Sequence, residues 1–308
     1  MNSYETMRGT VVLAGGLGFI GRRLHSLLRA DGWDVKVLSR RRSVVDGKTI
    51  FWWDPASCQI DERFPLTVQA VVNLAGENIA GGRWTRRFKE ALYRSRIDST
   101  CFLVSMADHW QAKTFIQVVG VGYYGYDRGD EWLSESAPPG DGFLARLSID
   151  WEAAAQEVMA LNRRLVILRT GVVIGADGGI IARLMPLALL NLLSPLGSGN
   201  QWMSWIHIDD LATVIQWALN SPHSAGIYNA CAPRPVRHKK FIYEFVSSIN
   251  KAIFLPNVPR WMLRIMLGEM ERALTGSLRV DSSRIRQMIS LRYPTIEAAL
   301  NAVSPLKR

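Results

Sequence analysis

The sequence predicts an α/β fold with a doubly wound parallel sheet and a small, mostly helical module near its C-terminal end. Short apolar runs alternate with helical segments through the first half of the 308 residues, a rhythm typical of a parallel sheet covered by helices on both faces. A turn rich in glycine follows the first apolar run, and the alternation ends near Gly175. Because crossovers between parallel strands are almost always right-handed, we expect the doubly wound arrangement.

The individual elements follow from hydrophobic periodicity. Residues 10–13 form a short apolar run typical of a buried strand, and residues 20–30 carry leucines at helical spacing. Further strands are expected at residues 34–38, 49–54, 70–76, 113–121 and 164–175, and further helices at residues 86–108 and 150–162.

The composition changes after Gly175. Residues 176–206 are rich in Gly, Pro and Leu. Their most apolar part, residues 184–196, is too short to cross a bilayer, so we expect it to be buried or to cover a pocket. We therefore expect one domain over residues 1–245, with residues 176–206 contributing to a substrate cleft, and a helical module over residues 246–308.

Composition places the chain among ordinary globular proteins, with 48% hydrophobic and 21% charged residues. Cys58, Cys101 and Cys231 lie far apart without a CxxC pair, so neither a disulfide framework nor a zinc site is expected. The N-terminal residues lack the basic stretch and apolar core of a secretory signal. We expect a cytoplasmic protein with no transmembrane segment and no bound metal.

The net charge of +10 is distributed rather than concentrated. A solvated basic surface is the main interpretation, and a phosphate-bearing small ligand is the best specific alternative. No nucleic-acid-binding pattern accompanies the charges, so nucleic acid is not the expected partner. Short basic clusters occur at residues 40–42, 86–87, 163–164 and 237–240.

The glycine loop predicts a dinucleotide site, because it lies between a strand and a helix. Gly15 permits the tight turn, Gly18 lets a pyrophosphate approach the backbone, and Gly21 lets the helix pack closely on the strand. Free N–H groups at the helix start, near Phe19 and Ile20, attract the phosphates.

The end of the second strand predicts the type of dinucleotide. An acidic residue there would bind the ribose 2′-hydroxyl of NAD, but this chain has Ser39 and Arg40 followed by two more arginines. A hydroxyl and a guanidinium fit a 2′-phosphate, so we expect NADP(H) rather than NAD(H). A solvated arginine turn stays open as an alternative. Asp54, after the third strand, could accept from the adenine amino group or simply cap a turn.

Several stretches together resemble the atypical short-chain dehydrogenase/reductases, specifically the YfcH-type group described as NAD-dependent epimerase/dehydratase-like. They include "AGGLGFIG", "NLAGENIAGGRWT", "GYYG", "RTGVVIGADGG" and "SWIHIDDL", and the resemblance runs from about Val11 to about Val303. It implies a Rossmann core that binds NADP(H), followed by the C-terminal helical module. The bulky "LLNLLS" run at residues 189–194 departs from the glycines usual in the family and is expected to narrow the cleft.

The resemblance also implies a set of cofactor contacts. Arg96, in the long helix after "NLAG", belongs to it, although a solvent-facing arginine is an equal alternative there. The full set is Gly15, Gly18, Phe19, Ile20, Gly21, Ser39, Arg40, Leu74, Ala75, Gly76, Arg96 and Val173.

The usual catalytic groups of short-chain reductases are missing. These enzymes use a serine and a Tyr-x-x-x-Lys, in which the lysine lowers the pKa of the tyrosine that transfers the proton. Here Val119 falls near the serine position, Leu144 at the tyrosine and Ser148 at the lysine. The chain contains no other Tyr-x-x-x-Lys.

Other polar groups fall near the carboxyl ends of the strands, where ligands bind in such sheets. Tyr124 is the candidate proton donor, with a packing aromatic as the alternative. A relay of His207 with Asp209 and Asp210 is a second arrangement, although these aspartates are expected chiefly to cap the helix that starts there. Further candidates are Tyr123, Glu77, Arg83 and Trp84.

Two functions of different classes therefore remain. The first is an NADP(H)-dependent oxidoreductase or epimerase-like enzyme acting on a small carbonyl or nucleotide-sugar substrate. The second is an NADP(H)-binding sensor or regulatory scaffold without turnover, favoured by the missing dyad. The sequence is compatible with a homo-oligomer and identifies neither the oligomeric state nor the substrate.

Overall fold

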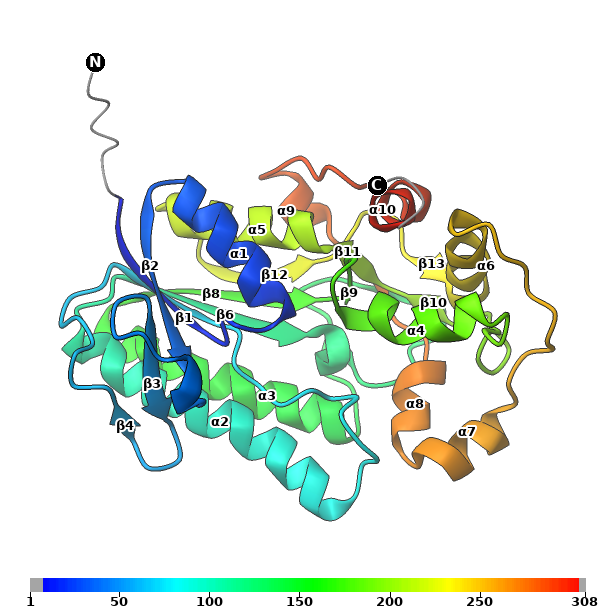
Figure 1. The fold of residues 1–308 in the computed structure, drawn as a ribbon, viewed down its shortest axis with the longest axis horizontal. Helices are drawn as coiled ribbons and strands as arrows, with labels where there is room; N and C mark the ends of the chain where they lie inside the picture. The colour runs from blue at the N-terminus through cyan, green and yellow to red at the C-terminus, as the bar shows by residue number, and fades with distance from the viewer. Residues whose placement is uncertain (1–7, 305–308) are drawn as a thin grey trace.

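The centre of the molecule is an eight-stranded sheet of order β12-β8-β6-β5-β1-β2-β3-β4 (Figure 1), seen in a computed structural model that describes residues 8–304. Neighbouring strands pair in parallel, except that β4 runs antiparallel to β3. The strands are β1 (Gly9–Ala14), β2 (Trp33–Ser39), β3 (Ile50–Asp54), β4 (Gln59–Ile60), β5 (Ala70–Asn73), β6 (Thr114–Gly120), β8 (Arg164–Thr170) and β12 (Gly226–Ala230).

Helices cover both faces of this sheet, which makes it doubly wound as expected. In Figure 1, α1 (Phe19–Ala30) and α5 (Ile208–Asn220) lie above it, and α2 (Arg86–His109) and α3 (Phe143–Gln156) lie below. The strand order reverses between β1 and β5. In open sheets of this kind, the carboxyl ends of the strands at the reversal point form a ligand-binding crevice.

The central strand β1 shows why the apolar runs are continuous. Val11 and Leu13 pack into the core beneath α1 and α5, while Val12 and Ala14 pack into the core on the opposite face. All four side chains are fully buried. A strand with helices on both faces has no polar side, so its sequence does not alternate.

The expected strand at residues 164–175 is interrupted. It divides into β8 and β9 (Val172–Ile174), and β9 leaves the sheet to pair with β11 (Trp205–His207). Gly171 lies at the break, where a Cβ atom would be 2.6 Å from the carbonyl oxygen of Ser204. A side chain at residue 171 would clash with this backbone. The glycine therefore permits the strand to change its pairing partner at this point.

The expected capping of α5 by Asp209 or Asp210 is wrong. The N-cap is His207, whose Nδ1 accepts the backbone N–H of Asp209 at 3.2 Å. The buried Asp210 instead accepts the backbone N–H groups of Arg292 and Tyr293, at 2.7 and 3.0 Å. The Asp210 carboxylate is therefore bonded to backbone 82 residues away along the chain and does not cap the helix.

The remaining elements pack mainly beside the carboxyl edge of the sheet, and helices α4, α6, α7 and α8 lie on the right of Figure 1. The expected boundary at residue 245 falls inside α6, which packs with α4 and α10 in one apolar core. Ile285 of α9 returns to the core beneath α1 and α5. The elements are α4 (Gly179–Leu189), α6 (His238–Ser248), α7 (Arg260–Leu267), α8 (Met270–Thr275), α9 (Ser283–Arg286), α10 (Ile296–Val303), β7 (Trp132–Leu133), β10 (Trp202–Met203), β13 (Val236–Arg237) and β14 (Arg279–Val280). Across residues 8–304, no helix combines the length and hydrophobicity needed to cross a membrane.

The packing of α9 against the core of the sheet can be tested by shortening the side chain of Ile285. Ile285 is fully buried, so Ile285→Ala should lower the free energy of unfolding by about 2–5 kcal/mol through lost burial and an unfilled cavity. The matched variant Ile265→Ala, at a position 66% exposed, should change it by less than about 0.5 kcal/mol. Denaturant unfolding measures both, and equal effects would contradict this packing.

Candidate nucleotide-binding site and adjoining cavity

The glycine loop joins β1 to α1 in a tight turn. Gly15 has φ of +80°, and a Cβ atom there would lie 2.7 Å from the carbonyl oxygen of Leu74 in the loop after β5. The N–H of Gly18 donates to the carbonyl oxygen of Gly15 at 2.9 Å. The loop is therefore closed upon itself and pressed against the neighbouring strand end.

The start of α1 has the features of an anion site. A Cβ atom on Gly21 would collide with the Gly15 carbonyl and lie 2.5 Å from Cα of Gly16, so only glycine lets the helix begin this close to β1. Gly18 occupies the N-cap position, and the first turn contains no acidic residue. With no side chain capping the helix, its first N–H groups and positive dipole end can serve a phosphate.

The side chains of Phe19 and Ile20, at the start of α1, pack against the rest of the protein. The ring of Phe19 packs against a loop of glycines, where Cβ atoms on Gly175, Gly178 and Gly179 would come within 2.5 to 2.8 Å of it. Ile20 packs against the core beneath α1 and α5. The two side chains therefore anchor the helix start, and their N–H groups belong to the first turn.

The end of β2 presents one arginine beside the loop after β5. Ser39 is buried, and its hydroxyl is used locally, accepting the N–H of Arg41 at 3.1 Å. The guanidinium of Arg42 stacks on the ring of Trp52 at 3.5 Å. Arg40 is 60% exposed, and its Nη2 lies 3.5 Å from Oε2 of Glu77. Arg40 can therefore exchange this weak contact for a ligand's anion.

A buried amide network shapes the loop that follows β5. Asn73 is fully buried, and its Nδ2 donates to Thr100 Oγ1 and Gln117 Oε1, each at 2.9 Å. Its Oδ1 accepts the N–H of Ala75 at 3.0 Å. The indole N–H of Trp151 completes the network by donating to Thr100. The backbone at Leu74 and Ala75 is thus held at the carboxyl edge, next to the glycine loop.

Arg96 is buried beneath the same loop rather than facing solvent. It is 7% exposed and donates to the carbonyl oxygens of Glu77 and Leu92, each at 3.0 Å. A Cβ atom on Gly76 would lie 3.1 Å from its Cζ. Burial lowers the pKa of Arg96 to about 10, which leaves it charged at neutral pH. The solvent-facing alternative is therefore wrong, and Arg96 supports the loop on which a cofactor would rest.

The remaining expected contact, Val173, lies in β9 and packs half-buried against the core beneath α1 and α5. The structure thus gathers the glycine loop, Arg40, the loop after β5 and β9 around the carboxyl edge. These are the residues that could hold an NADP(H) molecule.

A cavity of about 460 Å³ lies beside this edge, between the sheet and the C-terminal helices. Leu144, at the position where related reductases carry tyrosine, lines it from α3. Val119 is buried in β6 and Ser148 is buried in α3. Leu184 and Leu187, from the apolar segment that was expected to be buried or to cover a pocket, line the opposite wall.

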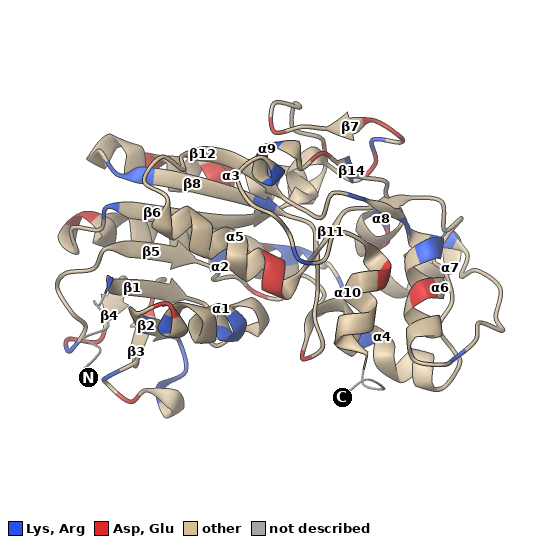
Figure 2. Cartoon of the chain, turned by 90° about the horizontal axis from the view of Figure 1, so that it is seen from above, with Lys and Arg blue, Asp and Glu red and all other residues tan. Residues whose placement is uncertain are grey.

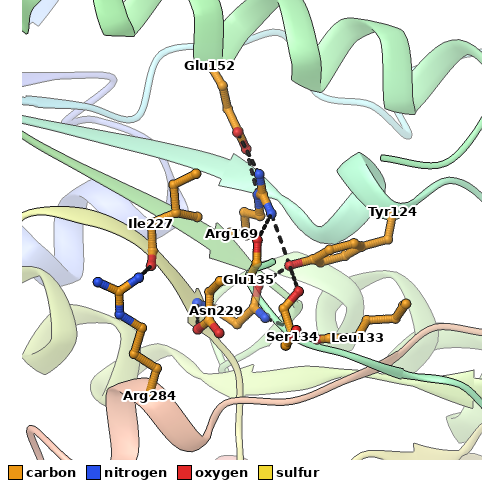
Figure 3. Close-up of polar contacts among 9 residues, drawn as sticks. All are labelled: Tyr124, Leu133, Ser134, Glu135, Glu152, Arg169, Ile227, Asn229 and Arg284. Atoms are coloured by element: carbon orange, nitrogen blue, oxygen red, sulfur yellow. Dashed lines mark hydrogen bonds and ion pairs between the residues drawn. The ribbon is translucent and has the colours of Figure 1, made fainter. Parts of the chain in front are cut away.

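Tyr124 lies inside the protein, within a network of polar contacts (Figure 3). It is fully buried, and its hydroxyl lies 2.8 Å from Asn229 Oδ1 and 3.0 Å from the Ser134 carbonyl oxygen, while it accepts from Arg169 Nη1 at 3.1 Å. Burial raises its pKa to about 12. This geometry supports a structural role for Tyr124 rather than the expected proton donation.

The centre of the same network is a buried ion pair that sequence reasoning missed. Arg169 of β8 is 1% exposed and forms two hydrogen bonds to Glu152 of α3, at 2.7 and 2.8 Å (Figure 3). Its guanidinium also stacks on the ring of Tyr123 at 3.3 Å. Burial alone would lower the pKa of Arg169, but the Glu152 carboxylate outweighs burial and raises it. A charged residue at the end of an apolar strand was the available signal.

The expected His207 relay lies in a different hollow, next to Phe19 and α1. Burial lowers the pKa of His207 to about 4, and its Nε2 has no hydrogen-bond partner among the described residues. The Asp209 carboxylate is 3.8 Å from Nδ1, beyond hydrogen-bond distance, and Asp210 binds backbone as described above. No proton relay is assembled by these three side chains.

The other polar candidates are spread along the loop after β5. Trp84 is buried and donates its indole N–H to the Ile79 carbonyl, whereas Arg83 is exposed.

Within the described residues, no three His, Cys, Asp or Glu side chains are grouped to hold a metal. Figure 2 shows Lys and Arg on many elements, interspersed with Asp and Glu.

Known proteins match the chain along most of its length. The model of the NAD dependent epimerase/dehydratase family matches residues 11–231. The epimerase family protein Mb2239 of Mycobacterium bovis is 36% identical over 294 residues, covering 94% of this chain and 96% of that protein. The crystal structure of human epimerase family protein SDR39U1 (isoform 2) with NADPH has a TM-score of 0.85 at 31% identity, over 96% of this chain and 99% of that chain. A nucleoside-diphosphate sugar epimerase from Corynebacterium glutamicum has a TM-score of 0.77 at 30% identity, and the match covers 96% of this chain and 58% of that one.

The buried ion pair makes a stability prediction. Glu152→Gln should lower the free energy of unfolding by about 3–5 kcal/mol, because it leaves the Arg169 charge buried without a counter-charge. Glu90→Gln is the matched control, since Glu90 pairs with Arg94 on the exposed face of α2, and it should cost less than about 1 kcal/mol. Denaturant unfolding at pH 7 compares them. A cost for Glu152→Gln as small as that of the control would show that the pair is not needed.

Proposed function

The chain belongs to the NAD-dependent epimerase/dehydratase family, and from this premise we propose that it is an NADP(H)-dependent oxidoreductase or epimerase-like enzyme acting on a small carbonyl or nucleotide-sugar substrate. The observation that carries the proposal is the uncapped start of α1 at the carboxyl edge, with Arg40 beside it and a cavity adjoining it. The relative crystallised with NADPH supports the same cofactor.

The residues at the edge fit NADP(H). The glycine loop and the first turn of α1 would hold the pyrophosphate, and Arg40 would bind the 2′-phosphate with its planar donors. Arg96 and Asn73 would keep the loop after β5 in place against the cofactor. When bound, NADPH would supply hydride to a carbonyl carbon, and NADP⁺ would accept hydride from an alcohol carbon. The cavity beside it would orient the substrate and exclude water.

The three free cysteines support a reducing, cytoplasmic location as part of the proposal.

A sensor or regulatory scaffold that binds NADP(H) without turnover is the second candidate. The specific observations in its favour are the hydrocarbon side chains of Val119 and Leu144 at two usual catalytic positions, and the burial of Tyr124. Tight cofactor binding is common to both candidates, so only turnover separates them.

The cofactor preference depends on one exposed side chain. The chain should bind NADPH more tightly than NADH, and Arg40→Ala should weaken NADPH binding about 10- to 100-fold while leaving NADH binding unchanged, because a charged hydrogen bond to phosphate is lost. Arg87→Ala is the control, because Arg87 is an exposed arginine on α2 and is not among the expected cofactor contacts. Titration of NADPH fluorescence measures both variants. Equal affinities for the two cofactors would refute the assignment.

Catalysis is tested with the cofactor present. Incubation of NADPH-saturated protein with a panel of carbonyl compounds should give loss of absorbance at the NADPH band for an oxidoreductase. Incubation of NADP⁺-saturated protein with nucleotide sugars should give an epimerised product without net change in the cofactor for an epimerase. The rate should fall in Arg40→Ala in proportion to cofactor occupancy and stay unchanged in Arg87→Ala. Tight NADPH binding without turnover on any compound would favour the sensor.

A further inference from the structure

The cavity beside the carboxyl edge has walls of hydrocarbon. Side chains from α3, α4, α7 and α8 meet there, so most of the surface that a ligand would touch cannot form hydrogen bonds. Its volume of about 460 Å³ lies in the range of small-molecule sites. The aliphatic walls include Leu144, Ile180, Leu184, Leu263, Leu267 and Leu278.

The few polar side chains of the lining are already engaged with the protein. Gln201 donates to the Leu196 carbonyl oxygen at 3.0 Å, and Ser194 donates to the Pro256 carbonyl oxygen at 2.6 Å. Burial lowers the pKa of His238 to about 4, so this side chain is neutral at pH 7. The interior therefore has little capacity to solvate a charged or many-hydroxyl ligand.

One cation borders the cavity. Arg183 is the charged side chain among the described residues that line it, and Arg183 is exposed on α4. A nucleotide sugar carries two phosphates and a ring of hydroxyls, and burying such groups without partners costs several kcal/mol each. A single exposed arginine does not match that demand.

Other arginines nearby belong to a separate hollow. This hollow is lined by Arg83, by Arg260 and Arg264 of α7 and by Arg272 of α8, together with Glu269 and Glu271 at the start of α8. Arg260 is already bonded to Glu271 at 2.7 Å. Glu269 is bonded to Lys89 at 2.7 Å, so both carboxylates have counter-ions of their own. This polar hollow is separate from the hydrocarbon lining of the cavity.

The cavity nevertheless reaches the position where chemistry would occur. Leu144 lines it at the position of the usual tyrosine, and Val172 lines it next to Val173 of the expected cofactor set. We propose that the cavity binds the hydrocarbon part of an apolar carbonyl compound, an aliphatic ketone or aldehyde, as the substrate class of this enzyme. The inference rests on the proposed function, which it narrows to substrates that place a hydrocarbon part in this cavity.

Calorimetric titration of 2-pentanone, 2-heptanone and 2-nonanone into NADP⁺-saturated protein tests the substrate class. Affinity should rise about fourfold for each methylene group that the cavity buries. UDP-glucose at the same concentration should give only heat of dilution. Ketone affinities that do not increase with chain length, or tighter binding of UDP-glucose than of 2-nonanone, would overturn the proposal.

Variants locate the binding. Ala273→Trp fills the cavity from α8 and should weaken 2-nonanone binding at least about tenfold, because overpacking excludes the chain. Ala153→Trp makes the same change on the exposed face of α3 and should have no effect. Leu187→Gln, at a lining position 43% exposed, provides a variant that stays folded if the tryptophan does not, and it should also weaken binding. Unchanged 2-nonanone affinity in the folded variants would refute the site.

A separate readout distinguishes failure of cofactor binding from failure of ketone binding. NADPH affinity, followed by its own fluorescence, should be the same in all three variants as in the unaltered protein. Absence of NADPH binding to the unaltered protein would refute the proposed function. Normal NADPH binding with no chain-length-dependent ketone binding would refute the cavity's assignment alone.

Discussion

The site depends on how closely α1 approaches the end of β1. Gly21 touches the backbone of Gly15 and Gly16, and a side chain there would push the helix away from the strand. The same helix buries Leu24 and Leu28 completely against the sheet. Packing of the core and placement of the helix start are therefore one constraint, since a helix moved outward to admit a Cβ atom would also lose its packing against the sheet.

The polar interior follows a second constraint, which is that each buried polar group needs a partner. Asn73 and Arg96 satisfy this rule by binding backbone of the loop they support, and Arg169 satisfies it through Glu152. Tyr124 is held in the Arg169 network, so its hydroxyl serves the fold. Some polar side chains near the carboxyl edge thus support the loop after β5, and others join the sheet to α3. The lining of the cavity is mainly apolar.

Local patterns predicted most of the fold and the nucleotide-binding loop. Apolar runs and helical spacing located the strands and helices, and the spacing of Gly15, Gly18 and Gly21 requires only neighbouring residues to be interpreted. The cap of α5 was mispredicted because Asp210 has a partner 82 residues away. The pairing of Arg169 with Glu152 and the apolar character of the cavity also arise from distant segments, which no local spacing encodes.

The contact between Arg40 and Glu77 gives the chain a counter-ion of its own. Both side chains are exposed, and pairs of this kind contribute at most about 1 kcal/mol, so the carboxylate can be displaced at little cost. The backbone of Glu77 is meanwhile fixed by Arg96. The guanidinium is thus partly neutralised and held beside the loop after β5. If Arg40 binds a 2′-phosphate as proposed, the phosphate would replace the Glu77 carboxylate, and less side-chain entropy would be lost than on ordering a free arginine.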